Sequence, residues 1–451
     1  MTSPHDLTQG SIAHHLYRMT VPMVWALFAN FAVQMTDIWF ISMLGHEALT
    51  AMGFVFPVMM VVFSLSIGLS AGAASVVARF APVKSKHDMQ CLVTDTLMLC
   101  LGLGVVLAVI GISAMDVIFL SIGADERLLP LIHDYMQIFF FNNIITMVAM
   151  NGLACVRALG DSKAQASSMI AASLVNLILD PIFIFGWGPI PRMELQGAVL
   201  ATTVARVVTL SMAFHVIMSK RLLTLPSLNP VRLKHSWGTL LHIALPAAGT
   251  NMIIPFSGAI ITALLASYGE YAVAGLGVAT RIEPMMLIVF YAMSSIVSPF
   301  VGQNLGVNAL SRIHKSALIS CQFAIAYGLF LTLVLWLFAK PVVALFTEDP
   351  KTAKVAVDYL LISSLSYGAA GVVMIVNACF NGLAKPLQAT TVSVLRVIIL
   401  YLPLAWGFSF LWQERGIFAA YSVVNFLCGG FGYYWFMRTS RSVCEAKGQS
   451  C

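Results

Sequence analysis

The chain has 451 residues, of which 59% are hydrophobic and 10% charged, with 25 Lys and Arg against 19 Asp and Glu. A soluble protein of this length would carry about a quarter charged residues, because its surface must face water. This composition excludes a soluble enzyme, a nucleic-acid-binding protein and a disordered scaffold. Its apolar residues form long blocks, such as 97–122, of the length that a helix needs to cross a bilayer. The sequence therefore predicts an all-α polytopic membrane protein.

Twelve apolar segments follow one another between polar or Gly- and Pro-containing breaks. The predicted spans are 16–43, 50–79, 89–121, 129–158, 163–187, 195–219, 237–266, 272–303, 312–338, 354–382, 386–412 and 416–440. The longest hydrophilic gap separates two sets of six spans. The predicted organisation is an N-terminal lobe (1–219), an inter-lobe linker (220–236), a C-terminal lobe (237–440) and a tail (441–451).

The distribution of Lys and Arg orients these spans. An even number of spans places both termini on one side, and that side collects most of the basic residues when alternate loops are assigned to it. The positive-inside rule makes it the cytoplasm, so we expect the termini, the linker and the tail to be cytoplasmic and the protein to lie in a bacterial inner membrane. The first residues are polar and no small-residue cleavage site follows the first apolar run, so we expect no removed signal peptide.

The two halves resemble each other. An offset of 224 residues superposes Pro22 on Pro246 and Gly45 on Gly269. Six spans per repeat preserve the sidedness, so we expect two pseudo-symmetric lobes, related by an axis along the membrane normal, around a central cavity. This plan is common in transporters.

Polar side chains recur inside the first-lobe spans. Asp37 lies in span 1 with Gln34 three residues earlier, Asp180 lies in span 5 with Asn176 one turn earlier, and Thr202 lies in span 6. At about 1.5 Å per residue, Asp37, Asp180 and Thr202 share one depth, roughly 10 Å from the outer surface. Ionisable residues in a membrane are costly and mark functional sites. We predict that these five residues form a coupling site.

The chemistry of such a cluster is cation exchange. Two carboxyls close together in a low dielectric cannot both ionise cheaply, so one is expected to take a proton from outside and release it inside. The neutral oxygens of Asn176 and Thr202 would also suit a sodium ion, and both couplings stay open. A structural alternative is that Asp180-Pro181 ends a helix and that Asp37 pairs with a basic residue such as Arg206.

The second lobe offers fewer candidates. Glu283 and Asp358 lie nearer the outer ends of their spans, and Arg281-Ile-Glu283 is expected to form a local ion pair. Arg396 in span 11 is expected to pair or to extend towards the membrane surface rather than to bind substrate. We therefore assign ion coupling to the first lobe.

Pro22 lies near the start of span 1. A proline inside a helix removes a backbone hydrogen bond and marks a kink, so Pro22 has two readings. It either lets the helix bend when Asp37 changes charge, or it simply begins the helix.

The chain resembles the multidrug and toxic compound extrusion (MATE) family. The resemblance rests on the two six-helix halves, on Val301-Gly302-Gln303-Asn304-Leu305-Gly306 and on Arg281-Ile-Glu283. It implies a V-shaped, two-lobed transporter that exports organic, often cationic, compounds by antiport against protons or sodium.

The first-lobe residues resemble those of the bacterial DinF-like branch of that family. In that branch the counterparts of Asp37, Asn176, Asp180 and Thr202 form a polar cluster, the counterpart of Asp37 is the protonation site, and that of Pro22 is the bending proline. We therefore expect a proton-coupled multidrug antiporter, with a sodium-coupled antiporter as the alternative.

The expected partners are small-molecule drugs and the lipid bilayer, with no nucleic acid, no cofactor beyond the coupling ion and no metal site other than a possible sodium site. We expect a monomer. A lipid-linked precursor flippase is less favoured, because it would need several cations in its cavity and only Arg206 and Arg396 lie deep in spans. A membrane-embedded enzyme would need a clustered nucleophile, metal motif or phosphate loop, which the sequence lacks. A structural scaffold would have no need of two acids at matched depth.

Overall fold

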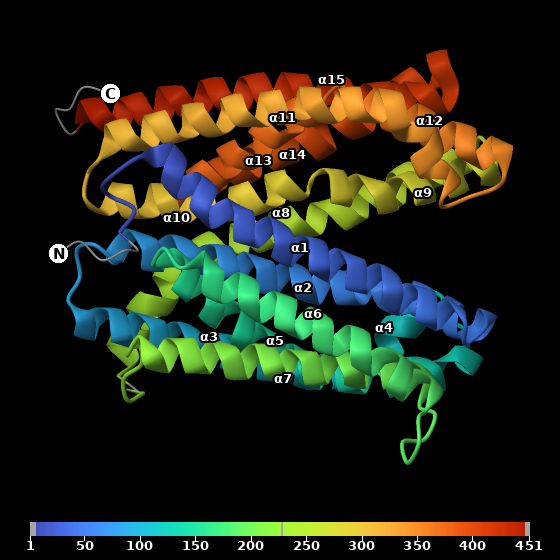
Figure 1. The fold of residues 1–451 in the computed structure, drawn as a ribbon, viewed down its shortest axis with the longest axis horizontal. Coiled ribbons are helices and arrows are strands. Elements are labelled where there is room, and N and C mark those ends of the chain that lie inside the picture. Colours follow the sequence, from blue (N-terminus) through green and yellow to red (C-terminus); the bar gives the residue numbers. More distant parts are fainter. Residues whose placement is uncertain (1–5, 227–228, 447–451) are drawn as a thin grey trace. The chain divides into compact units, whose positions relative to one another are not determined.

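The computed structural model describes residues 6–226 and 229–446 of the chain (Figure 1). These residues form helices joined by short turns, and within them the only extended pairing is an isolated bridge between Trp187 and Ile190. A helix satisfies its own backbone hydrogen bonds, which lipid cannot do for it. The predicted all-α fold is confirmed.

The helices are long enough to cross a bilayer. In chain order the elements are α1 (Ile12–Ser42), α2 (His46–Phe80), α3 (Lys86–Ser113), α4 (Met115–Ser121), η1 (Glu126–Leu128), α5 (Leu129–Ala158), α6 (Ser162–Phe185), α7 (Glu194–Ser219), α8 (Pro230–Ala266), α9 (Glu270–Met286), α10 (Ile288–Gly306), α11 (Leu310–Ala344), α12 (Pro350–Ser364), α13 (Tyr367–Gly382), α14 (Pro386–Val394), η2 (Leu395–Tyr401) and α15 (Leu402–Ala446).

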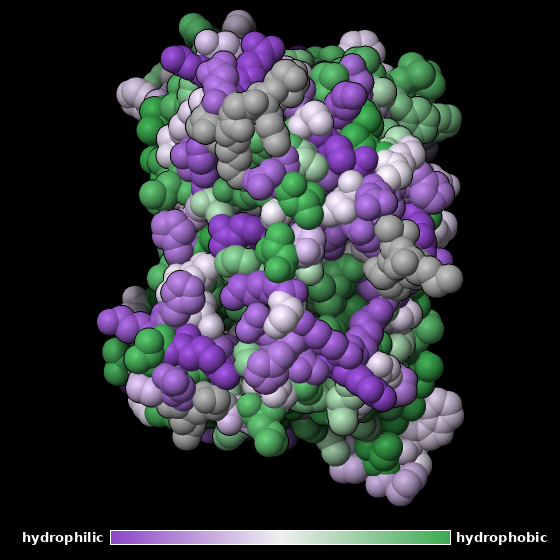
Figure 2. Space-filling model, turned by 90° about the vertical axis from the view of Figure 1, so that its left-hand side faces the viewer, coloured by the Kyte–Doolittle hydropathy of each residue, from purple (hydrophilic) through white to green (hydrophobic). Residues whose placement is uncertain are grey.

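The described helices contain 10 membrane-spanning candidates, or 11 when α12 and α13, which meet at a bend of 59°, count as one span. One candidate, Pro386–Ser442, contains the non-helical residues Trp412 and Gln413. Dividing it at that kink yields the twelve predicted spans. The eighth span is α9 followed by α10, broken at Leu287. Figure 2 looks along the helices from one end, and hydrophilic residues gather on this face, as expected for helix ends that lie outside lipid.

The chain divides into two compact units, and the first contains Val21–Ala248. Its centre is α5, which packs against α2, α3 and α7. Gly68 and Gly72 of α2 face the backbone of α8, and a Cβ on Gly68 would lie only 2.5 Å from the carbonyl oxygen of Ala244. Small residues allow such close helix contact where no hydrophobic effect drives association.

The second unit contains Leu7–Thr20 and the chain from Gly249 onward. Its centre is α13, which packs against α10, α11 and α15. A Cβ on Gly328 of α11 would lie 2.2 Å from the backbone nitrogen of Gly368 in α13, so only glycine fits at this crossing.

The Gln-Asn signature explains why the N-terminal segment belongs to the second unit. The side-chain oxygen of Gln303 accepts from the N–H of Leu7 at 3.1 Å, and the amide of Asn304 donates to the carbonyl oxygen of Leu7 at 3.2 Å. Arg312 donates to the carbonyl oxygens of Leu7 and Gly10 at 3.1 and 2.8 Å. These three side chains therefore hold the segment that precedes α1.

The units differ from the predicted lobes at two helices. The division passes through α1 between Thr20 and Val21, and through α8 between Ala248 and Gly249. Each division lies within three residues of a repeat-related proline, Pro22 or Pro246. The first helix of each repeat is thus shared between the units.

The predicted linker is shorter in the structure, because α8 begins at Pro230 rather than near residue 237. The side chain of Asn229 accepts from the N–H of Val231 at 3.1 Å, which caps this helix start. Linker residues 227–228 lie outside the described residues. The predicted tail begins inside α15, which extends to Ala446, and residues 447–451 also lie outside the described part.

Candidate functional site

The two first-lobe carboxyls lie at one depth. Asp37 and Asp180 are each five residues before the last residue of their helices, α1 and α6, which corresponds to about 8 Å. The helix α6 continues past Pro181 to Phe185. The reading that Asp180-Pro181 ends a helix is therefore wrong.

Each carboxyl has one oxygen that is buried and unbonded. Asn176 donates from its side-chain nitrogen to Oδ1 of Asp180 at 2.7 Å. Oδ2 of Asp180 and Oδ1 of Asp37 are buried and accept no hydrogen bond from the described residues. The ion pairs of the described chain do not join Asp37 to Arg206, so the predicted alternative pairing is wrong. Each acid thus has a buried carboxyl oxygen that accepts no hydrogen bond, and burying such an unpaired acceptor costs folding free energy.

Tyr135 belongs to the same neighbourhood and was missed by the sequence analysis. It lies in α5 at 5% exposure and interacts electrostatically with both Asp37 and Asp180. The two acids also interact with each other. Tyr135 is six residues after the start of α5, close to the depth of the acids, so a depth argument that included phenols would have made it a candidate without showing that it faces the acids.

The other predicted residues lie at the margin of this cluster. Thr202 is half-buried, eight residues after the start of α7, and α7 packs against α6. Gln34 has an exposed side chain. Among the described residues neither side chain bonds to a carboxyl of the cluster. The structure brings Asp37, Asp180 and Asn176 together, and leaves Gln34 and Thr202 without a direct bond to them.

Pro22 lies ten residues after the first residue of α1. The reading that it begins the helix is therefore wrong. It interrupts the backbone hydrogen bonding of α1 next to the point where the helix passes from one unit to the other.

In the second unit the expected pair between Arg281 and Glu283 does not form. Glu283 instead accepts from the hydroxyl of Tyr359 at 2.9 Å and from that of Tyr421 at 3.3 Å. Residues two apart in a helix do not face each other, which explains why the prediction failed. Arg396, expected either to pair or to extend towards the membrane surface, forms no ion pair with a described acid.

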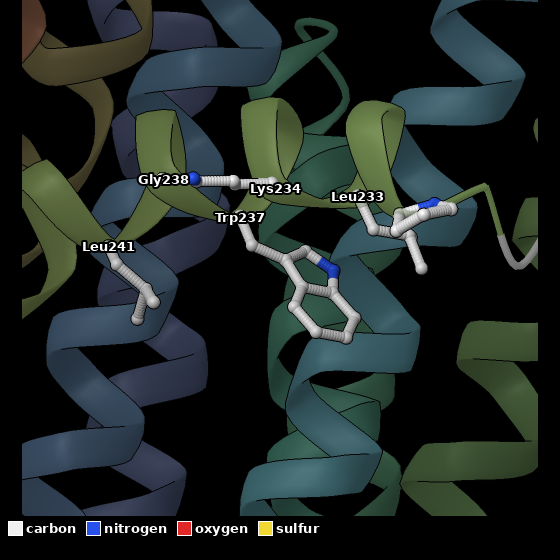
Figure 3. A pocket seen from close by; sticks show the side chains of 6 residues that line it. Leu233, Lys234, Trp237, Gly238 and Leu241 are labelled. Atoms are coloured by element: carbon white, nitrogen blue, oxygen red, sulfur yellow. The ribbon is translucent and has the colours of Figure 1, made fainter.

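Asp95 of α3 is a buried acid that the sequence analysis overlooked. Its side chain is 1% exposed and accepts from Arg232 at 2.6 Å and from Ser236 at 2.9 Å. The indole nitrogen of Trp237 donates to its carbonyl oxygen at 2.9 Å, and Figure 3 shows this ring directed away from α8. A surface pocket beside Trp237 contains none of the predicted site residues. Asp95 therefore anchors the start of α8 and takes no part in the coupling cluster.

Comparisons with known proteins agree with this architecture. The profile of the MatE family matches residues 22–182 and 246–406. A FAD transporter of Shewanella oneidensis is 34% identical over 446 residues, covering 99% of this chain and 98% of that protein. The probable multidrug resistance protein YoeA of Bacillus subtilis is 25% identical, covering 89% and 88%.

Solved structures match as well. The crystal structure of a mutant of the Vibrio cholerae MATE transporter VcmN superposes with a TM-score of 0.91 at 27% identity, covering 96% of this chain and 97% of that one. The bent form of VcmN superposes with a TM-score of 0.88 at 27% identity, covering 95% and 98%.

Proposed function

The chain belongs to the MatE family of membrane transporters, and we propose that it is a secondary antiporter that exports organic compounds in exchange for protons. The observation that carries the proposal is the pair of first-unit acids, Asp37 and Asp180, each with a buried oxygen that no described group bonds. Two negative charges in one low-dielectric site repel each other. Uptake of one proton removes that repulsion, and its release restores it.

The neighbours of the acids fit this role. Asn176 donates to Asp180 and so stabilises the charged form of that carboxyl, while Asp37 has no such donor on its buried oxygen. Asp37 is therefore the group that we expect to exchange the proton. Sodium is the alternative coupling ion, because carboxylate, amide and hydroxyl oxygens from Asp37, Asp180, Asn176 and Thr202 are the ligands that hard cations prefer.

The cargo has two candidates. Organic, often cationic, drugs are the first, because multidrug resistance proteins are among the relatives at about a quarter identity. A flavin nucleotide is the second, because the 34% identity to a FAD transporter extends over nearly the whole of both chains. The two differ in charge, since FAD carries two phosphates.

This difference in charge gives a test of the cargo. One elementary charge crossing the membrane exchanges about 2.3 kcal/mol per 100 mV. One-for-one exchange of a monovalent cation against a proton moves no net charge, so only the pH gradient drives it. Export of an anion against a proton moves positive charge inward, so an inside-negative potential drives it as well.

The location is part of the proposal. The excess of Lys and Arg on one side supports cytoplasmic termini, and the bacterial origin of the relatives supports a bacterial inner membrane. The pH gradient and the potential of such a membrane would both be available to the transporter.

The test is transport in proteoliposomes with pH, sodium and potential imposed independently, using ethidium and FAD as cargo. Wild type should export in response to a pH gradient without sodium. Asp37→Asn should lose this response, because Asn keeps the shape and cannot exchange a proton. Asp95→Asn serves as the control acid and should respond to pH like wild type. Export driven by a sodium gradient alone would identify sodium, rather than the proton, as the coupling ion. An Asp37→Asn variant that still exports in response to a pH gradient would overturn the assignment of Asp37.

A further inference from the structure

Arg396 carries a charged guanidinium and lies far from either end of its predicted span, 386–412. It lies ten residues after Pro386, where the stretch Pro386–Ser442 begins, and ten residues of helix measure about 15 Å, half of a hydrocarbon core. It lies in the π-helical turn η2 (Leu395–Tyr401), and π-helical turns recur at functional sites. A charged side chain at this depth requires a physical reason.

The hydrogen-bond donors of Arg396 are not used within the described chain. A guanidinium carries five N–H donors and no acceptor, yet no described carboxylate, carbonyl or hydroxyl accepts a hydrogen bond from it. Its contact is with the ring of Tyr421, whose centre lies 5.9 Å from the guanidinium carbon. A cation–π contact leaves the edge of the guanidinium, where the N–H groups lie, available to another partner.

An acid lies close by but is held by other groups. Glu283 of α9 interacts electrostatically with Arg396, but the two do not approach within the 4.0 Å of an ion pair. Its two oxygens accept from Tyr359 and Tyr421. The two phenols thus hold the carboxylate of Glu283, and the N–H donors of Arg396 remain available.

A further phenol completes the surroundings. Tyr367 of α13 is 0% exposed, and its hydroxyl lies beside Glu283, with which it interacts electrostatically. Tyr401, at the end of η2, interacts with both Glu283 and Arg396. Tyr367, Tyr401 and Tyr421 thus neighbour Glu283, and Arg396 beside them keeps its N–H donors available to a bound anion.

We propose that Arg396 binds an anionic phosphate or carboxylate group of an aromatic cargo molecule, with Glu283 as the resident counter-charge and Tyr401 and Tyr421 as the aromatic surface. The planar guanidinium matches the oxygens of a phosphate or a carboxylate in two parallel hydrogen bonds. Tyrosine rings stack on heteroaromatic rings. The proposal rests on the proposed export of organic compounds and names a class of cargo for it, of which flavin nucleotides are the examples to test.

Glu283 gives the proposal a second, opposite signature. A cargo anion bound to Arg396 is repelled by the charge on Glu283, so removing that charge should strengthen anion binding. A purely structural pair of charges would behave differently, because loss of either member would then damage the same packing.

The experiment measures binding of FAD, FMN and riboflavin to purified protein in nanodiscs by quenching of flavin fluorescence. Arg396→Gln should weaken FAD and FMN binding about tenfold or more, as expected for loss of a charge-assisted hydrogen bond, and leave riboflavin, which has no phosphate, within about twofold of wild type. Arg396→Lys should fall between, and Glu283→Gln should tighten FMN binding. The control is Arg281→Gln, because Arg281 is an exposed arginine of α9. This substitution should leave the affinities for FAD, FMN and riboflavin unchanged.

The outcomes separate this inference from the proposed function. Equal weakening of riboflavin and FMN by Arg396→Gln would mean that Arg396 is structural, and unchanged FAD and FMN affinity would mean that it does not touch the phosphate. Absence of FAD and FMN binding to wild type would also overturn the inference. None of these results affects pH-driven ethidium export or its loss in Asp37→Asn, which are measured on the same preparations.

Discussion

Replacing Asp95 with alanine should destabilise the first unit through the anchor of α8. The substitution removes a charge-assisted hydrogen bond from Arg232 at 2.6 Å and a neutral one from Ser236 at 2.9 Å. Such bonds contribute about 1.5–3 and about 1 kcal/mol respectively. Arg232 is 30% exposed, so water replaces part of its lost partner. We expect a loss of about 2 kcal/mol in the free energy of unfolding.

The assay is unfolding by SDS titration in mixed micelles, followed with a thiol-reactive fluorogenic dye that reports exposure of the buried cysteines, of which Cys100 and Cys155 lie in the first unit. The control is Asp88→Ala in the same helix, because among the described residues the side chain of Asp88 bonds only to Ser85, three residues earlier at the helix start. The loss in the free energy of unfolding caused by Asp88→Ala should be clearly smaller than that caused by Asp95→Ala.

A double-mutant cycle checks the reasoning. Asp95→Ala and Arg232→Ala each remove the same hydrogen bond, so the effects of the two substitutions should not add when they are combined. Full additivity would refute the role of Asp95 as an anchor of α8. A loss of unfolding free energy for Asp95→Ala no larger than that for Asp88→Ala would refute it as well.

Three further predictions follow from the helices. Pro22→Ala restores a backbone hydrogen bond in α1 and should slow cargo export in proteoliposomes while the response to pH remains; unchanged rates would exclude a bending role. Gly328→Ala places a Cβ 2.2 Å from a backbone nitrogen of α13 and should lower stability by about 3 kcal/mol in the SDS titration, whereas Gly102→Ala, which has open space, should not. Single cysteines that replace Leu225 and Trp187, which are 86% and 73% exposed, should label differently in intact cells with a permeable outer membrane. A membrane-impermeant reagent should label position 187 only. Labelling at position 225 would show that the orientation is opposite to the predicted one.

The spans and the depths of their polar residues could be predicted from the sequence, because the bilayer fixes both quantities along a single axis. Length and hydropathy located the helices, since lipid leaves the backbone no other way to satisfy its hydrogen bonds. The same one-dimensional argument placed Asp37 and Asp180 at one level, and in the structure the two acids interact electrostatically.

The lateral arrangement of the helices could not be predicted in this way. Depth alone does not show that Tyr135 of α5 faces the acids, or that Glu283 turns away from Arg281 towards Tyr359 and Tyr421. These contacts join residues from different helices, and the depth of a residue carries no signal for which helices are neighbours.

The segment around Leu7 has a consequence for synthesis. Its partner Gln303 follows 296 residues later, which takes about 15 to 60 s at bacterial and eukaryotic translation speeds of roughly 20 to 5 residues per second. Throughout that time the carbonyl oxygens of Leu7 and Gly10 lack the side chain of Arg312 that later bonds them. The first unit likewise lacks part of α8 until Ala248 has been made. The segment made first therefore gains its partners only after α10 and the start of α11 have been made, and assembly of the second unit must recruit a segment that has long since left the ribosome.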